Sequence, residues 1–264
     1  MQASVSFQIF LKNPINEDMF RMISSAGFKR CELWSMGEHV NYRDKKLREK
    51  IKMYSEKYNV LLDTAHLPLH TNDFKISLGD KEIGKKSLDE LLYASEFLDT
   101  LDVKTYVIHV SGDLEIFHKN FSKLYYNSEK NFAFENDPMG FPLTKDIPKI
   151  LEDLKRELRD SEKRLGACLD IGHANIWEKP PEKTVIELGK SIIATHISDN
   201  DGKYDLHVPP GEGNINWDEV LKAFKTIEYK HNFTFEISPS FEYEQIPKVL
   251  ERLKNFCEQN NILI

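Results

Sequence analysis

The feature that most constrains this chain is a regular alternation of short apolar runs with longer amphipathic stretches. This alternation is typical of repeated strand–helix units around a parallel sheet. The apolar runs predict strands over residues 5–10, 30–34, 60–66, 105–110, 131–136, 166–171, 192–197 and 233–238. The amphipathic stretches predict helices over residues 16–26, 45–57, 81–98, 146–160, 182–190, 217–227 and 243–259. Residues 112–129 are less regular, and we expect a loop with a short helix there.

Eight predicted strands, each followed by a helix, imply an α/β fold in which the sheet closes into a (β/α)8 TIM barrel. An open, doubly wound sheet of eight strands fits the same count. The length of 264 residues and the hydrophobic share of 40% fit one large domain with a substantial core. Because no low-complexity linker or long charge block divides the chain, we expect residues 1–264 to form a single TIM-barrel domain.

The composition bounds the partners and the location of the protein. The formal net charge of −7 argues against a nucleic-acid partner, although a local basic groove can lie within an acidic total. Cys31, Cys168 and Cys257 are far apart and form no CxxC motif, which indicates reduced thiols in a cytoplasmic protein. No signal peptide is apparent, and no run approaches about 18 apolar residues, so we expect no membrane partner. The sequence leaves open whether the chain forms a homo-oligomer.

Side chains that can bind a metal ion follow six successive predicted strands. They are His66, His109, Glu135, Asp170 with His173 close behind it, His196 and Glu236. The loop after the seventh strand adds Asp199, Asp205 and His207. In a barrel the carboxyl ends of all strands meet at one face, where the active sites of this fold are built. We therefore expect most of these side chains to converge at that face.

A metal ion is the interpretation that we favour for this cluster. A single histidine or acid at a strand end is more often a buried hydrogen-bonded group, and loop residues of these types often only cap turns. Six in succession are costly to bury without compensating charge, and these strand ends carry almost no Lys or Arg. A bound metal supplies that charge. Asp205 and His207 are two residues apart, so in an extended segment their side chains point the same way.

Three segments resemble the xylose isomerase-like TIM-barrel superfamily, which includes sugar isomerases and epimerases, inosose dehydratase and the endonuclease IV family. They are Cys168-Leu-Asp-Ile-Gly-His-Ala174, His196-Ile-Ser-Asp-Asn200 and Asp205-Leu-His-Val-Pro-Pro-Gly-Glu-Gly213. The resemblance implies a metal cofactor, Mn2+ or Zn2+, with Co2+ or Mg2+ as alternatives. In the epimerase branch it implies one ion held by Glu135, Asp170, His196 and Glu236. In the endonuclease IV branch it implies three zinc ions held by those four residues and by His66, His109, His173, Asp205 and His207.

The leading hypothesis from this resemblance is a metal-dependent isomerase or epimerase of a small sugar or polyol. It would transfer a proton through a metal-stabilised enediolate, with Glu135 and Glu236 as the catalytic pair that removes and returns the proton. The residues expected to contact the substrate are His66, His109, His173, His207 and Trp34. Phe10 and Trp177 are candidates for apolar walls of the sugar site. We expect a structural hydrogen-bonding role for Glu32, and a turn-forming role or one beside the metal ligands for Glu212.

The alternative hypothesis is an endonuclease IV-like multinuclear zinc phosphoesterase that cuts DNA at abasic sites. The loops after the first three strands offer few cations for phosphates, which argues against it. Ketose 3-epimerases usually place an arginine near the position of His207, and none stands here. No Lys/Arg pair resembles a phosphate clamp, which favours an unphosphorylated sugar. A catalytically silent binding barrel, the third class considered, would leave the carboxylate cluster without a purpose.

Overall fold

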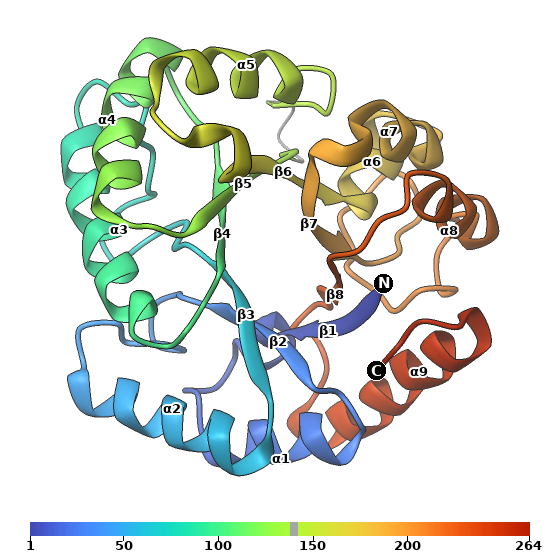
Figure 1. Cartoon of the computed structure of the whole chain (residues 1–264). Helices are drawn as coiled ribbons and strands as arrows, with labels where there is room; N and C mark the ends of the chain where they lie inside the picture. The colour runs from blue at the N-terminus through green and yellow to red at the C-terminus, as the bar shows by residue number, and fades with distance from the viewer. Residues whose placement is uncertain (138–141) are drawn as a thin grey trace.

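In the computed structural model, residues 1–137 and 142–264 are described, and they form a closed barrel of parallel strands. The strands pair in sequence order, and β8 closes on β1 with Ala3 opposite Phe233. Their bounds are β1 Gln2–Ser6, β2 Arg30–Trp34, β3 Leu61–His66, β4 Thr105–His109, β5 Asn131–Glu135, β6 Leu165–Asp170, β7 Ile192–Ile197 and β8 Asn232–Phe235. Figure 1 shows these strands inside a surrounding layer of helices. The predicted (β/α)8 barrel is therefore confirmed.

Helices connect the strands around the outside of the barrel (Figure 1). The α-helices are α1 Glu17–Ser25, α2 Lys45–Tyr58, α3 Gly84–Asp99, α4 Leu114–Asn127, α5 Ile147–Glu157, α6 Ile171–Trp177, α7 Pro181–Leu188, α8 Trp217–Thr226 and α9 Ile246–Asn260. Short 3-10 helices are η1 Phe7–Phe10, η2 Ser161–Lys163, η3 Gly189–Ser191 and η4 Tyr243–Gln245. Within the described residues, no helix combines the length and apolar character that crossing a membrane requires.

The prediction for the first strand was wrong at its carboxyl end. β1 stops at Ser6, and the apolar residues that follow it form the 3-10 helix η1. The Ser6 hydroxyl accepts a hydrogen bond from the Gln8 N–H at 3.3 Å, which caps this turn. Because all four residues of η1 are buried, their apolar run cannot be told from a strand by periodicity alone.

The prediction of a loop with a short helix over residues 112–129 was also wrong, because α4 spans most of that segment. The Asp113 side chain caps α4 by accepting hydrogen bonds from the N–H groups of Glu115 and Ile116. Asn120 interrupts the apolar face of α4 in the sequence. Its amide is buried and donates to the carbonyl of Leu78 at 2.8 Å, so a polar residue stands at a core position.

The alternation of side chains along each strand separates the two cores of the barrel. Side chains that point outward, such as Phe132, Phe134 and Leu169, belong to the large core between the barrel and its helices. Inward-pointing side chains of four strands form a small separate apolar cluster made of Val107, Ala133, Cys168 and Ala194. Two residues further along the same strands stand His109, Glu135, Asp170 and His196. The polar cluster therefore lies on the inner face of the barrel, at the carboxyl ends of the strands.

Asp199 organises the long loop between β7 and α8. Its backbone pairs in both directions with Val208, at 2.8 and 3.1 Å. One side-chain oxygen, Oδ1, accepts from the Asn200 and Ile215 N–H groups, and the other, Oδ2, accepts from the Gly211 N–H and from Trp217 Nε1. Asp199 is fully buried and its oxygens are occupied by these donors. It is therefore a structural residue, not the metal-capable one that the sequence suggested.

We expect Asp199→Ala to lower the free energy of unfolding by about 3 kcal/mol or more, because several buried donors lose their acceptor at about 1–3 kcal/mol each. The matched control is Asp201→Ala in the same loop. Asp201 is exposed, and among the described hydrogen bonds its carboxylate accepts from the Lys203 and Tyr204 N–H groups at the surface, so its loss is expected to cost less than about 1 kcal/mol. Chemical denaturation measures both values, and equal losses would contradict this account of the loop.

Candidate metal centre

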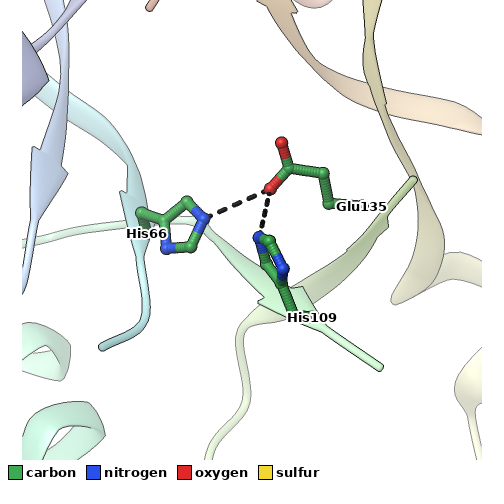
Figure 2. A group of neighbouring side chains, drawn as sticks. All are labelled: His66, His109 and Glu135. Atoms are coloured by element: carbon green, nitrogen blue, oxygen red, sulfur yellow. Dashed lines mark hydrogen bonds and ion pairs between the residues drawn. The ribbon is translucent and has the colours of Figure 1, made fainter. Parts of the chain in front are cut away.

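Glu135, the last residue of β5, is the central acceptor of the site. Its Oε2 lies 3.2 Å from His66 Nε2 and accepts a hydrogen bond from His109 Nε2 at 2.8 Å, as Figure 2 shows. Its Oε1 accepts from His196 Nδ1 at 2.7 Å. Burial by itself raises the pKa of Glu135, but the charges of His196 and His109 outweigh burial and hold this pKa well below its usual range. Glu135 is therefore an ionised carboxylate inside the barrel.

Asp170, His196 and Glu236 join Glu135 in a buried group whose potential ligand atoms all lie within 4.8 Å of one another. None of the four residues is more than 2% exposed. Asp170 Oδ2 and Glu236 Oε1 are buried without a hydrogen-bond partner among the described residues. Burial raises the pKa of Asp170, and it raises that of Glu236 to about 8. The group thus holds two carboxylate oxygens that have lost their water on burial, and no described residue replaces it with a hydrogen bond.

The chemistry of this donor set fits a divalent metal ion. Carboxylate oxygens and imidazole nitrogens are ligands that Mn2+ and Zn2+ accept. Within the described residues, the ion pairs of the three acids are with histidines alone, so no Lys or Arg compensates their charge. A bound cation would satisfy the two unpartnered oxygens and supply the missing positive charge. The four residues predicted for a single ion are therefore brought together by the fold.

Two further groups of potential ligands flank the first. His66 and His109 share Glu135 with it, and their ligand atoms also lie within 4.8 Å of one another. On another side, His173 Nε2 lies 3.4 Å and His207 Nε2 lies 3.0 Å from Asp205 Oδ2. The predicted convergence of Asp205 and His207 is confirmed. The extended segment assumed for it was wrong, because His207 has a φ of +47° and lies in a left-handed turn.

The ring nitrogens of the histidines are oriented by outer partners. Each of four rings places Nδ1 on an acceptor and turns Nε2 toward the carboxylates. The acceptors, at 2.7 to 3.0 Å, are Leu67 O for His66, Asp137 Oδ2 for His109, Asn136 O for His173 and Glu236 O for His207. His196 is reversed, since it presents Nδ1 to Glu135 and places Nε2 3.0 Å from Glu32 Oε1. Such outer hydrogen bonds fix which nitrogen can bind a metal.

The other predicted contact residues divide into two kinds. Trp34 lies at the site, because its ring stacks on His66 with a centroid distance of 4.4 Å and its Nε1 is buried without a described partner. Phe10 lies in the apolar core against Phe7 at 5.7 Å, so the wall role suggested for it was wrong. Trp177 is 55% exposed at the end of α6, where no described contact joins it to the site.

The roles that the sequence suggested for Glu212 and Cys168 differ from what the structure shows. The Glu212 carboxylate pairs with Arg252 of α9, so it ties the loop to a helix and does not support the ligands. Cys168 was considered only as a reduced thiol, yet its Sγ lies within 4.8 Å of ligand atoms of Glu135 and His196. Burial raises the pKa of this thiol. The sequence could have predicted this position, because Cys168 precedes Asp170 by two residues and its side chain therefore points to the same inner face of the barrel.

Comparison with known proteins agrees with this fold. The family model for xylose isomerase-like TIM barrels matches residues 20–256. An uncharacterized protein of Methanocaldococcus jannaschii is 26% identical over 245 residues, which are 87% of this chain and 81% of that protein. Fructoselysine 3-epimerase of Escherichia coli O157:H7 is 23% identical over 252 residues, 91% of this chain and 92% of the enzyme.

Among solved structures, a D-tagatose 3-epimerase-like protein superposes with a TM-score of 0.79 at 25% sequence identity. The match covers 99% of this chain and 98% of that protein. The curated relatives and this neighbour thus include proteins named as sugar epimerases or as similar to them. Because the family model spans most of the chain and the barrel carries the expected inner cluster, this chain belongs to the xylose isomerase-like TIM-barrel family.

Proposed function

We propose that this chain is a divalent-metal-dependent isomerase or epimerase that acts on a small sugar or polyol. The observation that carries the proposal is the pair of carboxylates of Glu135 and Glu236. They lie 2.7 and 3.4 Å from His196 Nδ1, beside Asp170, in one buried group. Two carboxylates at one potential metal position allow one to remove a proton next to a carbonyl and the other to return it. The sugar epimerases among the relatives support the same class of reaction.

Glu135, Asp170, His196 and Glu236 would hold the ion, which we expect to be Mn2+ or Zn2+, with Co2+ or Mg2+ as alternatives. When bound, the ion supplies Lewis-acid polarisation of a substrate carbonyl and its neighbouring hydroxyl. The protein contributes the rest of the site. It fixes the four ligand side chains at strand ends, it excludes water through burial, and it provides further polar groups to orient hydroxyls.

The two glutamates are suited to opposite roles in the proton transfer. His196 and His109 stabilise the charged form of Glu135, so it can accept the proton from the carbon next to the carbonyl. Glu236 is the second carboxylate of the same buried group, and it is the residue that we expect to return a proton to the substrate. Return of a proton to the opposite face of the same carbon inverts its configuration. Return to the neighbouring carbon interconverts aldose and ketose, and neither outcome needs an oxidant or reductant.

Trp34 and His173 are the residues that we expect to orient the sugar. Trp34 Nε1–H is a buried donor without a described partner, so a substrate hydroxyl can accept its hydrogen bond. Its ring also offers an apolar face beside His66. His173 Nε2 faces Asp170 and Asp205 at 3.8 and 3.4 Å, which places it between the two potential ligand groups. In a single-metal enzyme, His66, His109 and His207 would likewise contact the substrate.

A second candidate function is hydrolysis of a phosphoester by a multinuclear zinc site. The observation in its favour is that all nine potential ligands form three adjoining groups, two of which share Glu135. Against it, the described ion pairs of these ligands include no Lys or Arg that could bind a phosphate. This absence of cations favours the sugar isomerase or epimerase, and the number of ions bound per chain separates the two functions.

We expect Glu236→Gln to slow exchange of the substrate proton next to the carbonyl by about 100-fold or more, because an amide cannot carry the proton. The exchange is followed by NMR in deuterated water with a panel of ketoses and the metal-loaded protein. Glu212→Gln is the matched control, since the described ion pair of its carboxylate is with Arg252 of α9, away from the metal ligands. Exchange at the wild-type rate in Glu236→Gln would remove this residue from the mechanism.

We expect the affinity for Mn2+ or Zn2+ to fall as the pH falls below about 8. Burial disfavours the charged form of His196, but the negative groups around this ring outweigh burial and raise its pKa well above the usual value. The pKa of Glu236 is raised to about 8. Both groups must lose a proton before they bind a metal, so binding releases protons. Calorimetry in buffers of different ionisation enthalpy measures this release, and an affinity independent of pH would be incompatible with it.

A further inference from the structure

We propose that Glu32 is a positioning residue for His196. It accepts the Nε2–H of the imidazole and so holds Nδ1 toward Glu135, Asp170 and Glu236. This inference rests on the metal site of the proposed function. It extends that site from the four ligands to a carboxylate that lies behind one of them, and it replaces the general structural role that the sequence suggested for Glu32.

Glu32 is buried and is held toward His196 by its neighbours. Glu32 lies on β2 and is 0% exposed. Its Oε1 accepts from His196 Nε2 at 3.0 Å and from the Ser6 hydroxyl at 3.2 Å. Ser6 stands directly opposite Glu32 in the register of β1 and β2, so the neighbouring strand holds this carboxylate in place. The hydrogen-bonded chain therefore runs from Ser6 through Glu32 to the ligand His196.

His196 needs this partner because its ring is reversed relative to the others. His66, His173 and His207 each give Nδ1 to a backbone carbonyl, which leaves Nε2 for the site. His196 faces the site with Nδ1, so its outer nitrogen is Nε2, at the far end of the ring. The described hydrogen bonds give this nitrogen Glu32 as its acceptor. A proton held on Nε2 means that the proton lost on metal binding is the one on Nδ1, whose lone pair then faces the ion.

The interior of the barrel gives Glu32 the room to reach this ring. β2 and β7 are not neighbours in the barrel, so the side chain crosses the interior. The inner face of β7 below His196 carries Ala194, and the adjoining inner positions on β5 and β6 carry Ala133 and Cys168. These side chains are small. Larger ones at these positions would occupy the space through which Glu32 approaches His196.

Folding stability by itself does not explain a carboxylate at the position of Glu32. Burying a carboxylate costs free energy unless its oxygens are hydrogen-bonded, and Glu32 Oε2 is buried without a described partner. Its other oxygen serves a residue that we place among the metal ligands. Metal affinity and folding stability should therefore respond differently to a change at Glu32. The hydrogen bond to His196 would govern metal binding, whereas the unpartnered oxygen contributes little to stability.

The test compares Co2+ and Mn2+ binding by the metal-free full chain in four proteins: wild type, Glu32→Gln, Glu32→Ala and Thr64→Val. Calorimetry gives the affinity, the visible absorption of Co2+ reports the geometry of its ligands, and thermal unfolding of the metal-free chain reports stability. Glu32→Ala removes the acceptor, so we expect its affinity to fall about 10- to 100-fold with a changed Co2+ spectrum. Glu32→Gln keeps an acceptor oxygen, so we expect a smaller loss.

Thr64→Val is the matched control. Thr64 stands opposite Glu32 in the β2–β3 register, and its buried hydroxyl has no described partner, so its loss leaves His196 untouched. We expect wild-type affinity and an unchanged spectrum. Wild-type affinity in Glu32→Ala, with only a lower unfolding temperature, would show a purely structural Glu32 and overturn the inference. Failure of the wild type to bind either ion would instead overturn the proposed function.

Discussion

The buried carboxylate of Glu135, surrounded by three imidazoles, is the interaction on which the rest of the site depends. A carboxylate inside a barrel loses its hydration, and His109 and His196 replace it with hydrogen bonds, while His66 Nε2 lies 3.2 Å from Oε2. The same contacts bring β3, β4 and β7 to one centre. Asp170 and Glu236 lie beside this centre and each retains an unpartnered oxygen. The polar arrangement is therefore complete around Glu135 and incomplete around the other two acids, where a cation would complete it.

The barrel creates this arrangement through its two-residue alternation of inner and outer side chains. Outer aromatic residues fill the core against the helices, while small apolar inner residues stand two positions before the ligands along the strands. The site thus rests on strand backbones, with the loop after β7 adding Asp205 and His207 under the control of Asp199. This division lets polar residues gather inside without weakening the apolar layer that holds the helices to the strands.

Much of the fold and the ligand set could be predicted, because strand-end position and two-residue periodicity decide which side chains enter the barrel. His66, His109, Glu135, Asp170, His196 and Glu236 all follow from that rule. The rest depends on tertiary contacts that the sequence does not display. Phe10 enters the core because a serine-capped turn ends β1, and Asp199 faces loop amides although its residue type resembles a ligand. The reversal of the His196 ring depends on Glu32, which lies 164 residues away in the chain.

The most direct test of the central claim is the metal content per chain, measured by elemental analysis of protein purified without chelator. We expect close to one divalent ion in the wild type, retained in His109→Ala and lost in Asp170→Asn, whose amide cannot supply the same charged ligand. Two or three zinc ions, with a loss in His109→Ala, would support phosphoester hydrolysis. Absence of any bound ion from the wild type, even after incubation with Mn2+, Zn2+ or Co2+, would contradict the claim that these strand ends form a metal centre.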